Sequence, residues 1–196
     1  MHIGILLRGT TTFTGGVTNS GAISAGGRGI AVGTGSGAAA AGVSTFAGNV
    51  LNNGKITAAT GVAVLGGSIV LGAIVDSGTI VATSHGILID SASEILAGSN
   101  TAIDIAGRTF TGGITNFGVI SGSAGIEIAS AHAVSIFDAG TIIGAGGTAI
   151  EFTGSGNTLT LGAGYSISGA VDPSGSNTFQ LGGSGSDTFD LFTIEQ

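Results

Sequence analysis

Acidic side chains recur at one position of a short motif, and they are the residues of this chain best able to do chemistry. The motif reads Gly or Ala, Ile, a variable residue, then Ile or Phe, and its variable position holds Asp104, Glu127 and Glu151. Another carboxylate, Asp90, directly follows one further copy. If successive copies stack in register, neighbouring carboxylates lie about 5 Å apart, close enough to raise each other's pKa or to share a cation.

The earlier copies of this motif favour a simpler role for the acidic position. Their variable residues are uncharged: Leu6, Ala31, Ala63 and Leu88. Exposed charges are ordinarily solvated and contribute solubility. The sequence therefore favours an exposed acidic column that keeps the surface soluble, with cation binding and catalysis as alternatives.

A second candidate for chemistry lies near the C-terminal end. Residues 182–190 fit one copy of the calcium-binding nonapeptide, with Asp187 and Asp190 as the candidate calcium ligands. Calcium needs six or more oxygen ligands, which stacked copies would supply, but the preceding segment at Asn177 lacks the glycine-rich prefix. A structural turn is favoured over a metal site, so we predict no metal and no cofactor.

No nucleophilic or metal-binding constellation accompanies these carboxylates. The three histidines, His2, His85 and His132, share no repeat position and have no metal-ligand spacing. Serines are frequent, but none lies in a Gly-x-Ser-x-Gly elbow with an identifiable His and acid. Cysteine is absent, which excludes disulfides and thiol chemistry. We predict that this chain is not an enzyme.

The elements that would position these side chains come from a longer repeat. It reads aliphatic, spacer, Asn or Asp, spacer, Gly, spacer, Ile, and it occurs five times. Its polar residues are Asn19, Asn52, Asp76, Asn116 and Asp138. The copies start 33, 24, 40 and 22 residues apart, which fits a unit of about 20–24 residues with one skipped copy and one insertion. Such a period predicts a solenoid, in which each unit buries its apolar face against its neighbours.

Each copy predicts a bend followed by a second short strand. Asn, Asp and Gly tolerate left-handed backbone angles, so the Asn-x-Gly element is expected to turn the chain. Its polar residues are expected to stack across rungs as a structural turn ladder, with side-chain hydrogen bonds between neighbours. Short alternating strands joined by such bends predict an all-β fold, a right-handed parallel β-helix of roughly eight or nine rungs.

Composition agrees with this fold and limits the partners. The chain of 196 residues has 40 glycines, 42% hydrophobic residues and only 8% charged residues. A net charge of −7 with four basic residues argues against nucleic-acid partners and anionic membrane surfaces. Residues 56–75 are uncharged and long enough to span a bilayer, but their four glycines and β-branched residues favour strands. We divide the chain into β-helix repeats over 1–156 and divergent C-terminal rungs over 157–196.

The repeats and the chain's ending resemble the passenger regions of bacterial autotransporters, the type V secreted proteins. The Asn-x-Gly-x-Ile repeats and Gly-Ile-x-Ile strands are similar to their β-helical stalks. Residues 177–191 are similar to the segment that precedes their outer-membrane barrel. Filamentous-haemagglutinin-like exoproteins use similar units. The resemblance implies a C-terminal outer-membrane β-barrel translocator in the parent chain, and a location at the cell surface or outside the cell, anchored through the outer membrane.

The function expected from the fold and the resemblance is that of a non-catalytic, surface-displayed or secreted stalk. It would act in adhesion to a host or neighbouring-cell ligand, or in self-association, because an open end of a β-helix exposes unpaired backbone groups. Two alternatives stay open. One is a β-helical carbohydrate-active enzyme, a polysaccharide lyase or hydrolase that uses the acidic column, and the other is a calcium-binding exoprotein segment.

Overall fold

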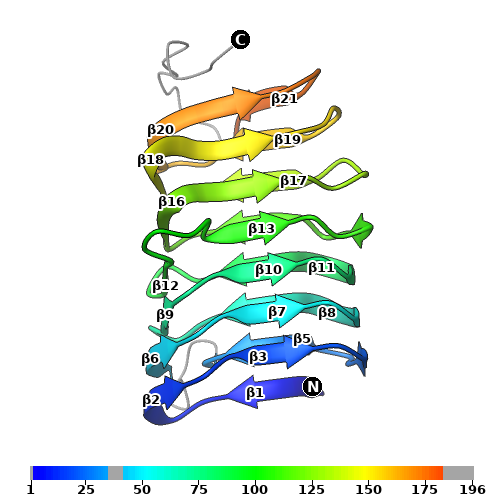
Figure 1. The fold of residues 1–196 in the computed structure, drawn as a ribbon, viewed down its shortest axis with the longest axis vertical. Coiled ribbons are helices and arrows are strands. Elements are labelled where there is room, and N and C mark those ends of the chain that lie inside the picture. The colour runs from blue at the N-terminus through cyan, green and yellow to red at the C-terminus, as the bar shows by residue number, and fades with distance from the viewer. Residues whose placement is uncertain (1, 35–41, 183–196) are drawn as a thin grey trace.

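The computed structural model describes residues 2–34 and 42–182, and these form one β-solenoid of about seven turns. All of its strands pair in parallel within two long sheets. Figure 1 shows the coils stacked along the longest axis, from β1 at one end to β20 and β21 at the other. The predicted all-β parallel solenoid is confirmed, and its right hand stays a prediction.

Ten strands form the first sheet, called here the ten-stranded sheet. They are β1 (Ile3–Leu7), β4 (Ala22–Ser24), β5 (Arg28–Val32), β8 (Lys55–Val64), β11 (Thr79–Ile89), β14 (Thr109–Phe110), β15 (Ile114–Asn116), β17 (Ser135–Asp138), β19 (Thr158–Leu161) and β21 (Thr178–Leu181). The strands β19 and β21 continue the sheet in register, so the divergent segment from 157 to 182 stacks like the repeats before it.

Eleven strands form the second sheet, called here the eleven-stranded sheet. They are β2 (Thr10–Thr14), β3 (Val17–Asn19), β6 (Val43–Ala47), β7 (Val50–Asn52), β9 (Ile69–Leu71), β10 (Ile74–Asp76), β12 (Glu94–Leu96), β13 (Ile103–Ile105), β16 (Val119–Ile128), β18 (Thr141–Phe152) and β20 (Ser166–Pro173). Residues 56–75 lie mainly in β8, β9 and β10, and no helix in the described ranges is long and apolar enough to cross a membrane.

The core consists mainly of columns of aliphatic side chains that run from coil to coil, with Phe46, Phe110 and Phe152 among them. One column follows the ten-stranded sheet through Ile30, Val62, Ile87, Ile114 and Ile136, each paired with the next in register. These side chains are at most 1% exposed. Alternation of period two along each strand points these residues inward. The alternate positions Ala31 and Ala63, expected to be exposed, are buried as well. The small branched residues of the sequence therefore build a narrow core that repeats along the rod.

The described residues make about seven turns, and eight strands stack along the main path of the ten-stranded sheet, which agrees with the predicted eight or nine rungs. One turn takes 32 residues from Ile30 to Val62 and 27 residues from Ile87 to Ile114. Both exceed the predicted unit of about 20–24 residues. Longer connections between strands enlarge these turns without adding rungs.

Candidate functional site

The Asn/Asp residues of the long repeat form hydrogen-bonded ladders inside the coil. In the first ladder, Asn19 Nδ2 donates to Asn52 Oδ1 at 2.7 Å, and Asn52 Nδ2 donates to Asp76 Oδ1 at 2.7 Å. These residues stack in register on β3, β7 and β10 of the eleven-stranded sheet. Each amide also bonds a backbone carbonyl of the next coil, Asn19 to Lys55 O and Asn52 to Thr79 O. The ladder therefore bonds side chains and backbone across three coils.

The five polar residues do not form a single column. A separate ladder on the ten-stranded sheet joins Asn116 on β15 to Asp138 on β17, with Asn116 Nδ2 donating to Asp138 Oδ1 at 2.8 Å. The first ladder ends where Asp76 pairs with Ile105. The second begins where Asn116 pairs with Ile89. The polar position of the repeat thus changes sheet between Asp76 and Asn116.

The bend expected at each Asn-x-Gly is present, but its physical basis differs from the prediction. No non-glycine residue in the described ranges has a positive φ, and Gly54, Gly78 and Gly140 do not adopt one either. The backbone N–H of the glycine instead donates to the Asn or Asp side chain two residues earlier, as from Gly78 to Asp76 Oδ1 at 3.2 Å. The left-handed explanation is wrong, and a side-chain-to-backbone turn replaces it.

The glycine of the repeat is required by the close approach of neighbouring coils. An added Cβ at Gly54 would meet the carbonyl oxygen of Gly21, one at Gly78 that of Gly54, and one at Gly140 that of Gly118. At Gly21, on the first coil, a Cβ would meet nothing within 4 Å. Stacking, and not backbone angle, therefore explains the glycine in each later copy.

The ladder gives a direct prediction for Asn52. An Asn52→Asp variant keeps the acceptor for Asn19 but loses the donor to Asp76 and places two carboxyl groups together in the core. We expect a loss of about 2 kcal/mol in the free energy of unfolding. Asn53→Asp is the matched control, because Asn53 is exposed and adjacent. Denaturant unfolding measures both, and equal stabilities of the two variants would contradict the ladder's contribution.

The acidic residues lie together as a second feature, the acidic column, on the eleven-stranded sheet. Asp104, Glu127 and Glu151 occupy consecutive register positions of β13, β16 and β18, and Asp172 on β20 follows them. All four are half-buried rather than fully exposed. Burial raises the pKa of Asp104. The sequence motif did not identify Asp172, because Val171 and Pro173 replace its two isoleucines. A motif that allowed any aliphatic residue or proline at those two positions would have included Asp172.

Asp90 does not belong to the acidic column. Its Oδ2 accepts from Gly66 N at 2.6 Å, and its Oδ1 accepts from Ser93 Oγ at 2.6 Å. It therefore fixes a turn between coils. The uncharged residues that sequence reasoning placed earlier in the acidic column lie on the other sheet: Leu6, Ala31, Ala63 and Leu88. The column's actual predecessors on the eleven-stranded sheet are Thr18, Leu51 and Val75.

The acidic column runs along the rod and does not converge on one point. Within residues 2–34 and 42–182, no group of three or more His, Cys, Asp or Glu side chains is placed to hold a metal ion. Neighbouring carboxylates at a coil spacing of about 4.8 Å can attract cations from solution. The candidate calcium ligands Asp187 and Asp190 lie outside the described residues.

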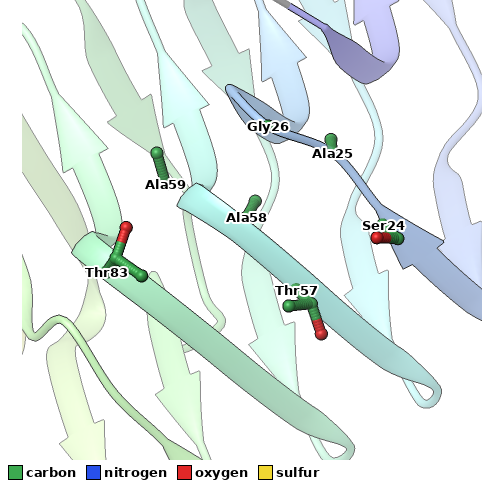
Figure 2. A pocket seen from close by; sticks show the side chains of 7 residues that line it. All are labelled: Ser24, Ala25, Gly26, Thr57, Ala58, Ala59 and Thr83. Carbon is green, nitrogen blue, oxygen red and sulfur yellow. The ribbon is translucent and has the colours of Figure 1, made fainter.

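A shallow pocket of about 330 Å³ lies on the flank of the coil. Figure 2 shows its lining side chains on three neighbouring segments, residues 24–26, residues 57–59 and Thr83. These are Ser, Ala, Gly and Thr residues, so hydroxyl groups are its only polar side chains. One step along the chain, Ser84 Oγ and His85 Nδ1 lie 2.8 Å apart. The two residues are adjacent in sequence, and no carboxylate among the described residues accepts a hydrogen bond from either side chain.

The described residues thus show two buried polar ladders that bond the coils and one acidic column along the eleven-stranded sheet. Comparison with known proteins adds no assignment, because no family model, no curated protein and no solved structure matches this chain.

Proposed function

We propose that this chain is a non-catalytic β-helical stalk of an autotransporter-like protein, surface-displayed or secreted, that acts in adhesion or self-association. The observation that supports this most is the uninterrupted stacking of coils around one apolar core. A rod of this kind has a repetitive surface and little concave space, which suits display and contact better than turnover of a small substrate.

The resemblance to autotransporter passenger regions supports the location. It points to a cell-surface or extracellular position, with a C-terminal outer-membrane β-barrel translocator in the parent chain. The ligand in adhesion would be a molecule on a host or neighbouring cell. The described core is mainly aliphatic, and backbone and side-chain ladders bond its coils. The rod can therefore fold coil by coil as the chain is secreted.

Self-association is supported by the half-buried apolar side chains at the two ends of the described coil. Most inward apolar residues of the first coil are half-buried, whereas their partners on the second coil are fully buried; Ile5 compared with Ile30 is one such pair. The partly buried apolar residues that pack on the core are Ile5, Leu7, Phe13, Ile23, Ala25, Val75, Tyr165, Ile167 and Phe179. All but Val75 lie on the first or the last described coil. A second copy stacked there would bury them.

The charge of the chain is strongly polarised along the rod, which favours head-to-tail contact between copies. Residues 1–75 contain three basic and no acidic side chains, whereas residues 76–196 contain eleven acidic and one basic. Strands at both ends run in the same direction because every pairing is parallel. Head-to-tail stacking would preserve parallel pairing and bring opposite charges together, and such an open contact gives linear assemblies.

Sedimentation of the 196-residue chain tests this mode of action. We expect oligomers that grow with concentration and weaken as salt rises, because salt screens the attraction between opposite ends. Ile5→Lys is expected to give a monomer, since it places a charge on the first coil's apolar edge. Leu71→Lys is the control: Leu71 is 45% exposed on the flank, and its variant is expected to associate like the parent.

Two results would count against this mode of action. A parent chain that stays monomeric at every concentration would remove self-association and leave adhesion as the function. Equal association of the Ile5→Lys and Leu71→Lys variants would show that the ends of the coil do not mediate the contact.

A further inference from the structure

The two ladders have a direction, and both end at an aspartate. Each Asn donates its Nδ2 to the Oδ1 of the residue on the next coil, from Asn19 to Asn52 to Asp76 and from Asn116 to Asp138. An ionised Asp has no donor to continue the series. The next coil has an apolar side chain at the ladder position, since Asp76 pairs with Ile105 and Asp138 pairs with Leu161.

One oxygen of each terminal aspartate has no hydrogen-bond partner. Oδ1 of Asp76 accepts from Asn52 Nδ2 and Gly78 N, and Oδ1 of Asp138 accepts from Asn116 Nδ2 and Gly140 N. Oδ2 of each is buried and unpartnered, and both side chains are 0% exposed. An ionised carboxylate in this position would leave half of its charge unsolvated and unbonded.

No cation compensates Asp76. On the strands that flank it, β7 carries no ionisable side chain and β13 carries only another acid, Asp104. Two bases lie on neighbouring segments, Lys55 at the start of β8 and Arg108 in the turn after β13, and both are exposed.

The surroundings of Asp138 are equally free of cations. The flanking strands β15 and β19 carry no ionisable side chain. Across the coil, β16 and β18 carry Glu127 and Glu151, which belong to the acidic column.

We propose that Asp76 and Asp138 are held as neutral carboxylic acids in the folded coil, so that protonation stabilises the solenoid and rising pH weakens it. Each ladder then ends in a neutral acid in place of a buried charge. The fold thereby contains two built-in proton-dependent contacts in its interior, and Asp104 of the acidic column adds to the effect of the burial that raises the pKa of Asp76.

The direction of the effect follows from burial. Desolvation is the main cause that raises the pKa of Asp76 and of Asp138, and the hydrogen bonds from Asn52, Gly78, Asn116 and Gly140 partly oppose it. A carboxyl whose pKa is higher in the folded than in the unfolded state stabilises the fold fully below the unfolded value of about 3.9. That stabilisation is lost as the pH rises through the folded pKa, and above it the free energy of unfolding stays at its lower level.

Thermal melting as a function of pH tests the proposal on the full chain. We expect the parent Tm to fall by roughly 5 °C or more between mildly acidic and neutral pH. Asp76→Asn with Asp138→Asn, which imitates the neutral acids, is expected to remove most of that fall. Glu151→Gln is the control, because Glu151 is half-buried in the acidic column outside the ladders and its replacement should leave most of the fall in place. A double variant that keeps the parent's pH dependence would overturn the proposal.

An infrared measurement on the folded parent covers the case in which the double variant does not fold. At about pH 5.5, above the ordinary pKa of Asp, the folded chain is expected to show the C=O stretch of a protonated carboxylic acid. The band should disappear on unfolding and decrease in each single variant, Asp76→Asn and Asp138→Asn. If the folded parent lacks this band at that pH, the two aspartates are ionised and the inference is wrong.

Discussion

An Ile150→Asp variant is expected to lose the solenoid altogether, whereas Ile143→Asp on the same strand, β18, is expected to keep it. Ile150 is 0% exposed and lies in register between Ile126 and Val171. Burying a carboxylate among these side chains, with no donor to bond it, costs several kcal/mol. A domain is stable by only about 5–15 kcal/mol, and a coil that opens removes support from both neighbours.

The control uses the same substitution on the outward face. Ile143 is half-buried and pairs with Ser121 and Ser168. An Asp there reaches water, so we expect a change below about 1 kcal/mol. Circular dichroism and resistance to protease distinguish the two variants. An Ile150→Asp protein that melts like the parent would mean that this register is wrong, and Ile126→Asp provides an independent repeat of the test.

The contrast with Asp76 explains why the core accepts one aspartate and should reject another. Asp76 is also 0% exposed, but Asn52 and Gly78 donate hydrogen bonds to its Oδ1. Position 150 offers only the side chains of an aliphatic column. Burial of a polar group is tolerated where donors are supplied, and the ladder is the place where this fold supplies them.

The solenoid itself could be predicted from the sequence because its two signals are local and repeated. Alternation of period two identifies the inward residues of each short strand, and the recurring Asn-x-Gly identifies the turn that follows it. The same reasoning anticipated that Asp104, Glu127 and Glu151 share a position, and the structure places them in consecutive coils of one sheet. These inferences needed only spacing within single copies of the motif.

The sheet on which each copy lies could not be predicted. Both sheets are parallel and offer an apolar inner face, so the same short motif fits either one. Val50 and Ile74 lie on the eleven-stranded sheet, whereas Ile114 and Ile136 begin their motif on the ten-stranded sheet. After Asp76, the next coil places β13 at the same position of the eleven-stranded sheet without the polar residue, and the motif returns one strand later on β15 of the ten-stranded sheet. The spacing of the copies does not show on which of the two sheets the motif returns.

This change of sheet also altered the candidate site. It divides the polar column into two ladders and therefore creates two terminal aspartates, each buried beside an apolar coil. It also places the acidic column after Thr18, Leu51 and Val75 rather than after the residues of the other sheet. The residue types in the sequence identified the candidate polar and acidic positions. Only the register of the strands shows which of these side chains lie on neighbouring coils.

A Gly78→Ala variant is expected to lose about 3 kcal/mol of unfolding free energy, at the upper end of the usual cost of overpacking. The added Cβ would meet the carbonyl oxygen of Gly54 on the preceding coil and lie 2.8 Å from Asn53 C and 2.9 Å from Gly54 N. These are backbone atoms within a hydrogen-bonded stack, so they cannot move aside as a flexible side chain would. Gly54→Ala is expected to behave in the same way, because its Cβ would meet Gly21 O. The midpoint of denaturant unfolding measures each change.

Gly21→Ala separates the two explanations for the glycine that recurs in each copy of the repeat, a left-handed turn and the close stacking of coils. If glycine served a left-handed turn, all three alanine variants would lose a similar amount, about 1 kcal/mol each. If it serves coil stacking, Gly21→Ala should change the stability by less than about 0.5 kcal/mol, because its Cβ would meet nothing within 4 Å. A large loss at Gly21 would therefore restore the turn explanation. A loss confined to Gly54 and Gly78 would show that the backbones of successive coils approach too closely for any side chain at this position.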